Sequence, residues 1–158
     1  MSNKDLPTTE NQKKRPSWDE YFMGVALLIS ERATCLRRRV GAVLVKDKRI
    51  LATGYNGAPS GIEHCSVTGC LRQEMNIPSG QRHEICRGLH AEQNVLLQAA
   101  KFGLSSQGST IYITNAPCSI CAKMIVNAGI KEVIFKDAYP DDMAMGFLAQ
   151  AEILVRKI

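Results

Sequence analysis

The chain has 158 residues, 45% of them hydrophobic and 22% charged, which is the composition of a single globular domain. This composition argues against a disordered chain, and the apolar runs are far shorter than the ~20 residues of a membrane helix. The formal net charge of +5 indicates either a solvated basic surface or an anionic partner, such as a phosphate-bearing small molecule or a nucleic acid.

The N-terminal part predicts a short tail followed by a helix. Residues 1–16 are polar and without periodicity, so we expect a flexible tail that precedes one domain over residues 17–158. The tail lacks the apolar stretch of a secretory signal, which favours a cytoplasmic location. Ser17 and Glu20 fit a capping box, and the helix is expected to run to about Ala33. Its apolar face comprises Trp18, Phe22, Val25, Ala26 and Ile29.

Two strands and a long irregular segment are predicted next. Residues 40–45 and 50–55 are typical of strands, and the polar residues 46–49 between them indicate a turn, so the pair predicts an antiparallel hairpin. Residues 56–88 show no sustained periodicity and contain three cysteines and two histidines. A structureless stretch of this length in a small domain indicates a functional role or a metal that holds it.

The second half of the chain alternates helices with short strands. The helices are expected over residues 90–102, 118–128 and 142–151, and the strands over residues 110–114, 131–135 and 152–156. Gly103 and Gly129 suit the left-handed position after a helix. This alternation predicts an α/β fold with parallel crossovers in its second half. Such sheets carry their sites at the carboxyl ends of strands, beside helix N-termini.

Two motifs at predicted helix starts carry the chemistry. His90 with Cys118 and Cys121 offers one nitrogen and two thiolates, and three protein ligands leave a fourth position open on a catalytic zinc. Cysteines at i and i+3 share a helix face, and the helix dipole favours their thiolates. Glu92 lies two residues after His90 and is expected to move the proton as general acid and base.

Taken alone, the C-x-x-C pair also suits a redox centre or half of a zinc knuckle. Together with Pro117 and the H-x-E motif, it forms the H-x-E…P-C-x-x-C signature of zinc deaminases. Six cysteines in a cytosolic chain also indicate metal binding or catalysis rather than disulfides.

The chain resembles the deoxycytidylate deaminases from Trp18 to about Ile153. The matching segments are Tyr21–Met23, Val40–Val45, Thr53–Gly61, His90–Asn94, and Pro117 with Cys118 and Cys121. The resemblance implies a three-layer cytidine-deaminase-like fold, with a central mixed five-stranded sheet flanked by helices. It also implies hydrolytic deamination of dCMP to dUMP and ammonia by a zinc-bound hydroxide, which supplies dUMP for thymidylate synthesis.

The resemblance also assigns substrate contacts. It implies that Asn56 holds the sugar, and that Ala91 and Tyr139 contribute to the substrate pocket. The phosphate of a nucleotide needs a cationic contact, and the basic cluster at residues 37–39 favours Arg38 and Arg39, although a solvated turn is the alternative.

A regulated homo-oligomer is implied as well, with a hexamer favoured. Many family members are activated by dCTP and inhibited by dTTP with Mg²⁺, and the segment Gly54–Gly61 matches a region that helps form their regulatory nucleotide site. By this resemblance Gly54, Tyr55, Asn56 and Gly57 are allosteric candidates.

The remaining cysteines predict a second metal. Cys35, Cys65, Cys70 and Cys86 would complete a closed tetrahedral zinc site that orders the irregular segment. Some microbial and viral deoxycytidylate deaminases similarly bind a structural zinc at positions that match Cys35, Cys65 and Cys70. His64 and His83 are alternative ligands, and free buried cysteines are the alternative to a site.

Two rival functions stay open at this point. One is a related deaminase acting on cytidine, guanine or a tRNA adenosine. With 6% aromatic residues and no aromatic-rich basic segment, however, no nucleic-acid partner is expected. The other is a non-catalytic zinc-binding regulatory protein. Glu92 argues against this alternative, because a carboxylate beside an open metal position has no structural role.

Overall fold

The structure is a computed structural model that describes residues 14–139 and 141–158. The predicted tail therefore lies outside the described residues except for positions 14–16, which are exposed and without regular structure. The strands are β1 (Gly41–Lys46), β2 (Arg49–Tyr55), β3 (Thr110–Asn115), β4 (Glu132–Asp137) and β5 (Leu154–Lys157). The longer helices are α1 (Trp18–Ser30), α4 (Ala91–Lys101), α5 (Ser119–Asn127) and α6 (Asp142–Gln150). Within this part of the chain, no helix has the length and apolar character needed to span a membrane.

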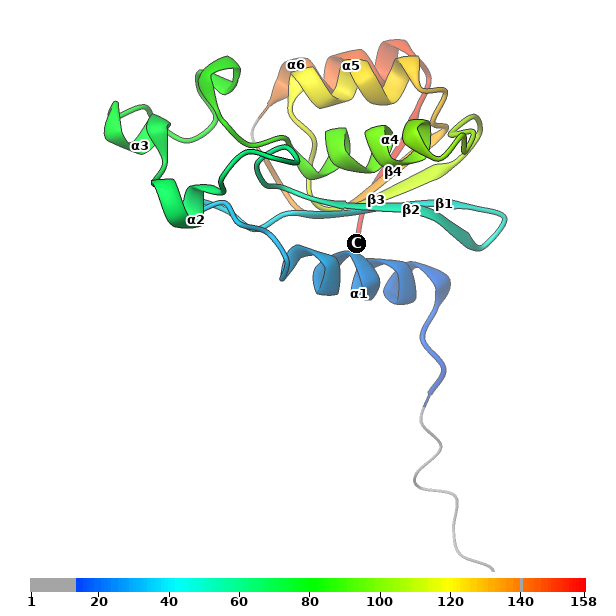
Figure 1. Ribbon diagram of the computed structural model, residues 1–158. Helices are drawn as coiled ribbons and strands as arrows, with labels where there is room; N and C mark the ends of the chain where they lie inside the picture. Colours follow the sequence, from blue (N-terminus) through cyan, green and yellow to red (C-terminus); the bar gives the residue numbers. More distant parts are fainter. Residues whose placement is uncertain (1–13, 140) are drawn as a thin grey trace, which may run out of the picture.

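The five strands form one mixed sheet in the order β2-β1-β3-β4-β5. β1 pairs antiparallel with both β2 and β3, whereas β3, β4 and β5 run parallel to one another. Helix α1 covers one face of the sheet, and α4, α5 and α6 cover the other (Figure 1). The predicted α/β architecture, a mixed five-stranded sheet between helical layers, is confirmed.

Helix α1 begins as predicted and ends earlier. The Ser17 amide donates to Glu20 at 2.7 Å and the Glu20 amide donates to Ser17 Oγ at 3.2 Å, which completes the capping box. The helix ends at Ser30 rather than near Ala33. The Ser30 hydroxyl donates to the Leu27 carbonyl at 2.6 Å and so competes with the backbone at this last turn.

The buried face of α1 is narrower than its apolar pattern. Phe22, Met23 and Ala26 are buried against the sheet, but Trp18 is 44% exposed. Met23 was not among the predicted core residues of this helix. Its burial reflects how the helix rolls on the sheet, which periodicity alone does not fix.

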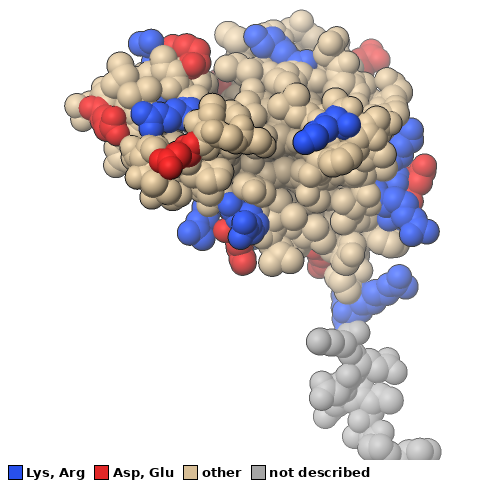
Figure 2. Space-filling view, viewed as in Figure 1, with Lys and Arg blue, Asp and Glu red and all other residues tan. Residues whose placement is uncertain are grey.

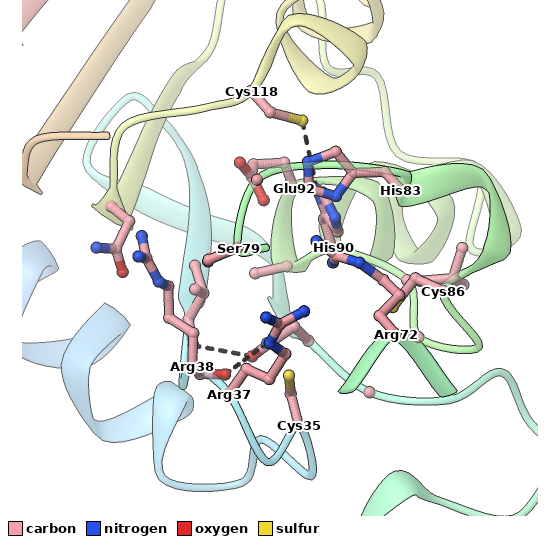
Figure 3. A pocket seen from close by; sticks show the side chains of 18 of the residues that line it. Cys35, Arg37, Arg38, Arg72, Ser79, His83, Cys86, His90, Glu92 and Cys118 are labelled. Atoms are coloured by element: carbon pink, nitrogen blue, oxygen red, sulfur yellow. Dashed lines mark hydrogen bonds between the residues drawn. The ribbon is translucent and has the colours of Figure 1, made fainter. Parts of the chain in front are cut away.

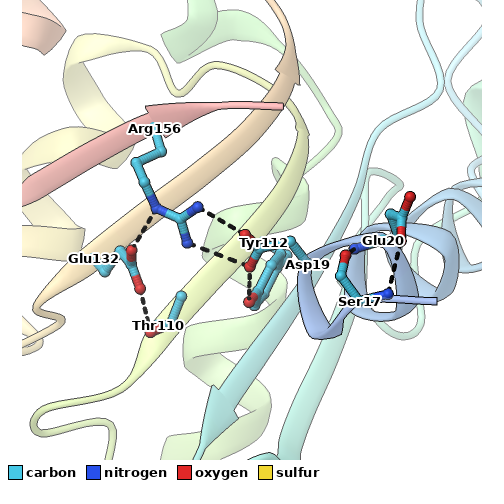
Figure 4. Close-up of polar contacts among 7 residues, drawn as sticks. All are labelled: Ser17, Asp19, Glu20, Thr110, Tyr112, Glu132 and Arg156. Atoms are coloured by element: carbon cyan, nitrogen blue, oxygen red, sulfur yellow. Dashed lines mark hydrogen bonds and ion pairs between the residues drawn. The ribbon is translucent and has the colours of Figure 1, made fainter. Parts of the chain in front are cut away.

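A polar network holds α1 across the second half of the sheet (Figure 4). Arg156 on β5 donates to Glu132 on β4 at 2.8 Å and to Asp19 on α1 at 2.7 Å. The Tyr112 hydroxyl also donates to Asp19, at 2.8 Å. Hydrogen bonds from Arg156 hold the pKa of the Asp19 carboxyl below its usual value, although burial opposes the shift. The first helix is thereby tied to the last strand.

The opposite face of the sheet packs directly against the backbone of α4. A methyl group on Gly54 of β2 would lie 2.4 Å from the Ala91 carbonyl oxygen and 2.5 Å from the Val95 amide nitrogen. Only glycine permits this approach, and it sets the position of the N-terminus of α4. Residue 90, which caps that helix, is therefore fixed by the packing of the sheet.

Residues 57–89 form a closed excursion from the sheet. Gly57 and Leu89 exchange two backbone hydrogen bonds, of 3.2 and 2.9 Å, so the two ends of the excursion meet just before His90. The segment contains only short pieces of helix: α2 (Cys65–Thr68), α3 (Leu71–Glu74) and the 3-10 turn His83–Ile85. The excursion projects beyond the end of the sheet (Figure 1). The prediction of a long segment without sustained periodic structure is consistent with these single turns.

Candidate active site

The site lies where the N-termini of α4 and α5 meet. His90 caps α4 and Cys118 caps α5, each in extended backbone conformation. The Nδ1 atom of His90 lies 3.4 Å from the sulfur of Cys118 and 3.4 Å from that of Cys121. The parallel arrangement of β3 and β4 and the close packing of α4 on β2 bring these two helix starts together.

Additional hydrogen bonds fix the N-termini of α4 and α5. The Gln93 side chain accepts a hydrogen bond from the His90 amide at 2.8 Å. Asp141 accepts from the Ser119 amide at 2.8 Å and from the Ala144 amide at 2.9 Å, so one carboxylate caps both α5 and α6. Sequence reasoning missed Asp141, because its role at α5 depends on the approach of a segment 22 residues away.

The three ligand atoms of His90, Cys118 and Cys121 lie within 4.8 Å of one another. This set of one nitrogen and two sulfurs is typical of a catalytic zinc site with one open coordination position. Two of the three residues are buried. In the described residues no other group of three histidine, cysteine or acidic side chains is this compact. The residues present therefore fit the metal that the sequence predicts.

The charges at this site suit metal binding and proton transfer. The hydrogen bond with Cys121 lowers the pKa of the Cys118 thiol to about 4, and His90 adds to the shift. Glu92 is 5% exposed, and its burial raises the pKa of its carboxyl to about 7. A carboxyl with a pKa near neutrality can both take and return a proton.

A cavity opens from these residues toward the 57–89 segment (Figure 3). Glu92, His90 and Cys118 lie at one end of the view, and Arg37 and Cys35 lie at the other. Most of the predicted substrate residues line this cavity: Asn56, Ala91, Tyr139 and Arg38. The end of β3 and its following turn also contribute, through Asn115 and Ala116.

Two of the predicted substrate contacts have surroundings of their own. Arg39 is exposed and is not part of the cavity wall. Successive side chains of an irregular segment point in different directions, which a run of three arginines does not reveal. The amide of Asn56 accepts from the Val40 amide and donates to the Arg38 carbonyl, each at 2.8 Å. One amide hydrogen of Asn56 remains for a ligand.

The residues predicted to bind a regulatory nucleotide divide between two environments. Asn56 and Gly57 line the catalytic cavity itself. Gly54 is buried against α4 with no room for a ligand. Tyr55 is partly buried, and its carbonyl accepts from Asn94 at 2.7 Å.

The four remaining cysteines gather around the same cavity. Cys35, Cys65, Cys70 and Cys86 all belong to its wall. Burial raises the pKa of the Cys65 thiol, and the neighbouring thiols of Cys86, Cys70 and Cys35 raise it further. His64 is engaged with Thr34, 2.9 Å from its hydroxyl, and His83 packs edge-on against His90 with ring centres 4.8 Å apart.

Sequence reasoning missed the most deeply buried cation of the site. Arg72 on α3 is 7% exposed and lines the cavity, as does the partly buried Arg37. Nothing in the local pattern distinguishes Arg72 from the exposed basic residues, because its burial depends on how the 57–89 segment folds over the site.

The cytidine and deoxycytidylate deaminase zinc-binding region matches residues 16–137. This match covers both motifs and most of the sheet. The chain belongs to the cytidine and deoxycytidylate deaminase family. In this family member, His90, Cys118 and Cys121 form the candidate zinc site, and the resemblance seen in the sequence is confirmed.

Individual relatives agree with the family assignment. The chain is 42% identical over 137 residues to a deoxycytidylate deaminase of Schizosaccharomyces pombe, an alignment covering 87% of this chain and 42% of the relative. The chain thus spans less than half the length of that relative. It is also 41% identical to the deoxycytidylate deaminase of Mycobacterium phage D29, across 77% of this chain and 95% of the phage protein.

A solved structure of similar length shares the fold. The dCMP deaminase of cyanophage S-TIM5, in complex with dCMP and dUMP, superposes with a TM-score of 0.76 at 36% identity. The superposition covers 91% of this chain and 98% of the phage chain. The similarity therefore extends over about nine-tenths of this chain.

Proposed function

We propose that this protein is a zinc-dependent hydrolase that deaminates dCMP to dUMP and ammonia. The observation that carries the proposal is the convergence of His90, Cys118 and Cys121 beside the buried Glu92, at one end of a cavity lined by arginines. Relatives named deoxycytidylate deaminase match this chain at about 40% identity, and a similar structure binds dCMP and dUMP.

His90, Cys118 and Cys121 would hold the zinc, which when bound supplies an activated water. Glu92 faces the same cavity and moves two protons in turn. Its carboxylate takes the first from water and gives it to the ring nitrogen, then takes the second from the hydroxyl added to the base and gives it to the amine, which leaves as ammonia. The wall formed by Ala91 and Tyr139 excludes solvent around the base. Asn56 has one amide hydrogen left to orient the sugar.

The direct test is ammonia release by the purified, zinc-loaded protein from dCMP, deoxycytidine, CMP, dCTP and guanine. We expect the highest kcat/KM with dCMP, because the cavity joins a proton-transfer end to a cationic end. Activity on guanine alone would contradict the proposal, and so would an inactive protein with a full complement of zinc. The latter result would favour the non-catalytic regulatory protein.

The charge on the face shown in Figure 2 does not favour a nucleic-acid substrate. Basic side chains on the face in Figure 2 are scattered and interspersed with acidic ones rather than gathered into one patch. A tRNA-binding deaminase needs a continuous cationic surface with stacking aromatics. The free nucleotide is therefore the preferred substrate class.

Regulation and assembly are proposed on the family resemblance. We expect a homo-oligomer, with a hexamer favoured, located in the cytoplasm, activated by dCTP and inhibited by dTTP with Mg²⁺. Gly54, Tyr55, Asn56 and Gly57 remain the proposed regulatory residues. The same assay with added dCTP, or with dTTP and Mg²⁺, checks this. An unchanged rate and an unchanged substrate curve would contradict it.

We also propose a structural zinc held by Cys35, Cys65, Cys70 and Cys86, supported by their places in one cavity wall. Their sulfurs are less closely grouped than the ligand atoms of His90, Cys118 and Cys121, so this metal would draw them together. The expected result is two zinc ions per chain in protein never exposed to chelator. Replacing Cys65 with serine should lower the count to one and lower the melting temperature, because the 57–89 segment has little core of its own. A count of one in the unaltered protein would contradict this site.

A further inference from the structure

Helix α5 has no side-chain cap of its own. Cys118 is its N-cap residue, but its sulfur makes no capping hydrogen bond and lies 3.4 Å from Nδ1 of His90 instead. Serine, threonine, aspartate and asparagine are the usual residues at this position, because their side-chain oxygens accept from the free amides of the first turn. A cysteine that binds a metal cannot cap the helix in this way. The first turn of α5, which carries both candidate thiolates, therefore needs an acceptor from elsewhere in the chain.

Asp141 supplies that acceptor from the start of α6, which packs beside α5 (Figure 1). Its Oδ2 accepts from the Ser119 amide at 2.8 Å, and its Oδ1 accepts from the Ala144 amide at 2.9 Å. The first of these hydrogen bonds holds the peptide bond that joins Ser119 to Cys118. In residues 14–139 and 141–158, no ion pair involves Asp141. Both of its oxygens thus serve helix N-termini, where negative charge is favourable.

Asp141 also belongs to the segment that forms the opposite wall of the cavity. Tyr139 stands two positions earlier in the chain and lines the cavity, as does Cys118. The two segments leave the sheet side by side, because the Ala116 amide donates to the Asp137 carbonyl at 2.8 Å where β3 and β4 end. The contact of Asp141 with α5 joins the same two segments a second time, closer to the candidate metal ligands.

We propose that Asp141 is a positioning residue of the reaction, which holds the two thiolates of α5 in a fixed place relative to the Tyr139 wall. This inference rests on the proposed function, which places the base against the wall formed by Ala91 and Tyr139. Asp141 is not part of the cavity wall, so it acts through the groups that it holds and not by touching the substrate. A carboxylate suits this role, because it accepts one charge-assisted hydrogen bond at each helix N-terminus.

Two variants separate the two hydrogen bonds of Asp141. Asp141→Ser keeps one oxygen that can cap α6 and loses the oxygen that accepts from the Ser119 amide, whereas Asp141→Ala loses both. In each zinc-loaded variant we expect kcat for dCMP, per bound zinc, to fall by about 10- to 100-fold, the cost of misplaced reacting groups, with a much smaller change in KM. The melting temperature of Asp141→Ala should lie about 2–4 °C below that of Asp141→Ser, because only the alanine variant loses the α6 cap.

The comparison of these variants decides which helix matters for the reaction. An equal fall in kcat for both supports the contact with α5. An Asp141→Ser protein with unaltered kcat, beside an Asp141→Ala protein with a lowered one, would assign the effect to the cap of α6 and overturn the inference.

Asp142 offers a matched control at the next position of the chain. It carries the same charge at the start of α6, is exposed and is not part of the cavity wall. Asp142→Ala should leave both kcat and KM unchanged. A fall in kcat equal to that of Asp141→Ser would show a general effect of negative charge at this helix start and would contradict a specific role for the contact with Ser119.

The visible absorption of the cobalt-substituted protein gives a readout that does not depend on turnover. Co²⁺ at the His90, Cys118 and Cys121 site reports the ligand geometry in its spectrum. We expect the bands of Asp141→Ser to shift from those of the unaltered protein, and the bands of Asp142→Ala to stay in place. An unaltered spectrum in Asp141→Ser would overturn the inference, because the thiolates would then keep their places without Asp141.

Two further outcomes keep this test separate from folding and from the proposed function. If Asp141→Ser does not fold, Asp141→Asn keeps the shape with a single acceptor oxygen and should show the same changes in kcat and in the cobalt spectrum. An unaltered protein that does not deaminate dCMP would refute the proposed function. The cobalt spectra would still test whether Asp141 holds the thiolates in place.

Discussion

Replacing Glu92 with glutamine is expected to lower kcat for dCMP by about 10²- to 10⁴-fold, the range that a positioned acid and base contributes. Glutamine has nearly the same shape as glutamate but cannot accept or return the proton. Glu92 is 5% exposed beside the candidate ligands, and burial raises its pKa to about 7, so the unaltered side chain can act in both directions. Bound zinc and the melting temperature should remain those of the unaltered protein.

The measurement combines initial rates with metal analysis of the same preparation. Glu63→Gln is a suitable control, because Glu63 is exposed and lies outside the cavity wall. It should change neither rate nor zinc content. A Glu92→Gln protein that binds zinc and deaminates dCMP at the unaltered rate would remove Glu92 from the proposed mechanism.

Local signals predicted most of the fold. The capping box at Ser17 concerns neighbouring residues, and it is present in the structure. The hairpin turn falls at residues 46–49 as expected, with Asp47 and Lys48 at positive φ angles of 49° and 59°. These angles are those of a two-residue turn whose twist matches the flanking strands. The parallel second half followed in turn from the alternation of helices and strands.

Tertiary contacts explain what local signals missed in the fold. The end of α1, the burial of Met23 and the short turns within residues 57–89 depend on what packs against them. The hydrogen bonds between Gly57 and Leu89 join residues far apart in the sequence, and no periodic pattern predicts them. The position of the irregular segment could therefore be predicted from the sequence, but its conformation could not.

The candidate site divides in the same way. His90, Cys118 and Cys121 were recognisable because their spacing sets the geometry of a first helical turn. The cationic residues of the cavity were predicted only in part: Arg38 lines it, but Arg72, 34 residues further along the chain, was not among the candidates and is buried in its wall. A basic residue that becomes buried through loop folding has no sequence signature of its own.

Gly54→Ala is expected to destabilise the protein and to lower activity together. The added methyl group would lie 2.4 Å from the Ala91 carbonyl oxygen and 2.5 Å from the Val95 amide, both backbone atoms of α4 that cannot rotate aside. Overpacking of this kind costs about 1–3 kcal/mol, and the backbone contacts place the cost toward the upper end. Because α4 carries His90 and Glu92 at its start, a shift of about 1 Å would also lower kcat/KM on the order of 10²-fold.

Gly24→Ala is the matched control, since a methyl group there has no heavy atom within 4 Å. In the interior of α1 this change should stabilise the protein by about 0.5–1 kcal/mol and leave the rate unchanged. Chemical denaturation and dCMP kinetics on both variants check the pair. A Gly54→Ala protein with unaltered stability and basal rate but no response to dCTP would instead assign Gly54 to nucleotide regulation. If stability and rate are lost together, the result would support the role of Gly54 in positioning α4 on the sheet.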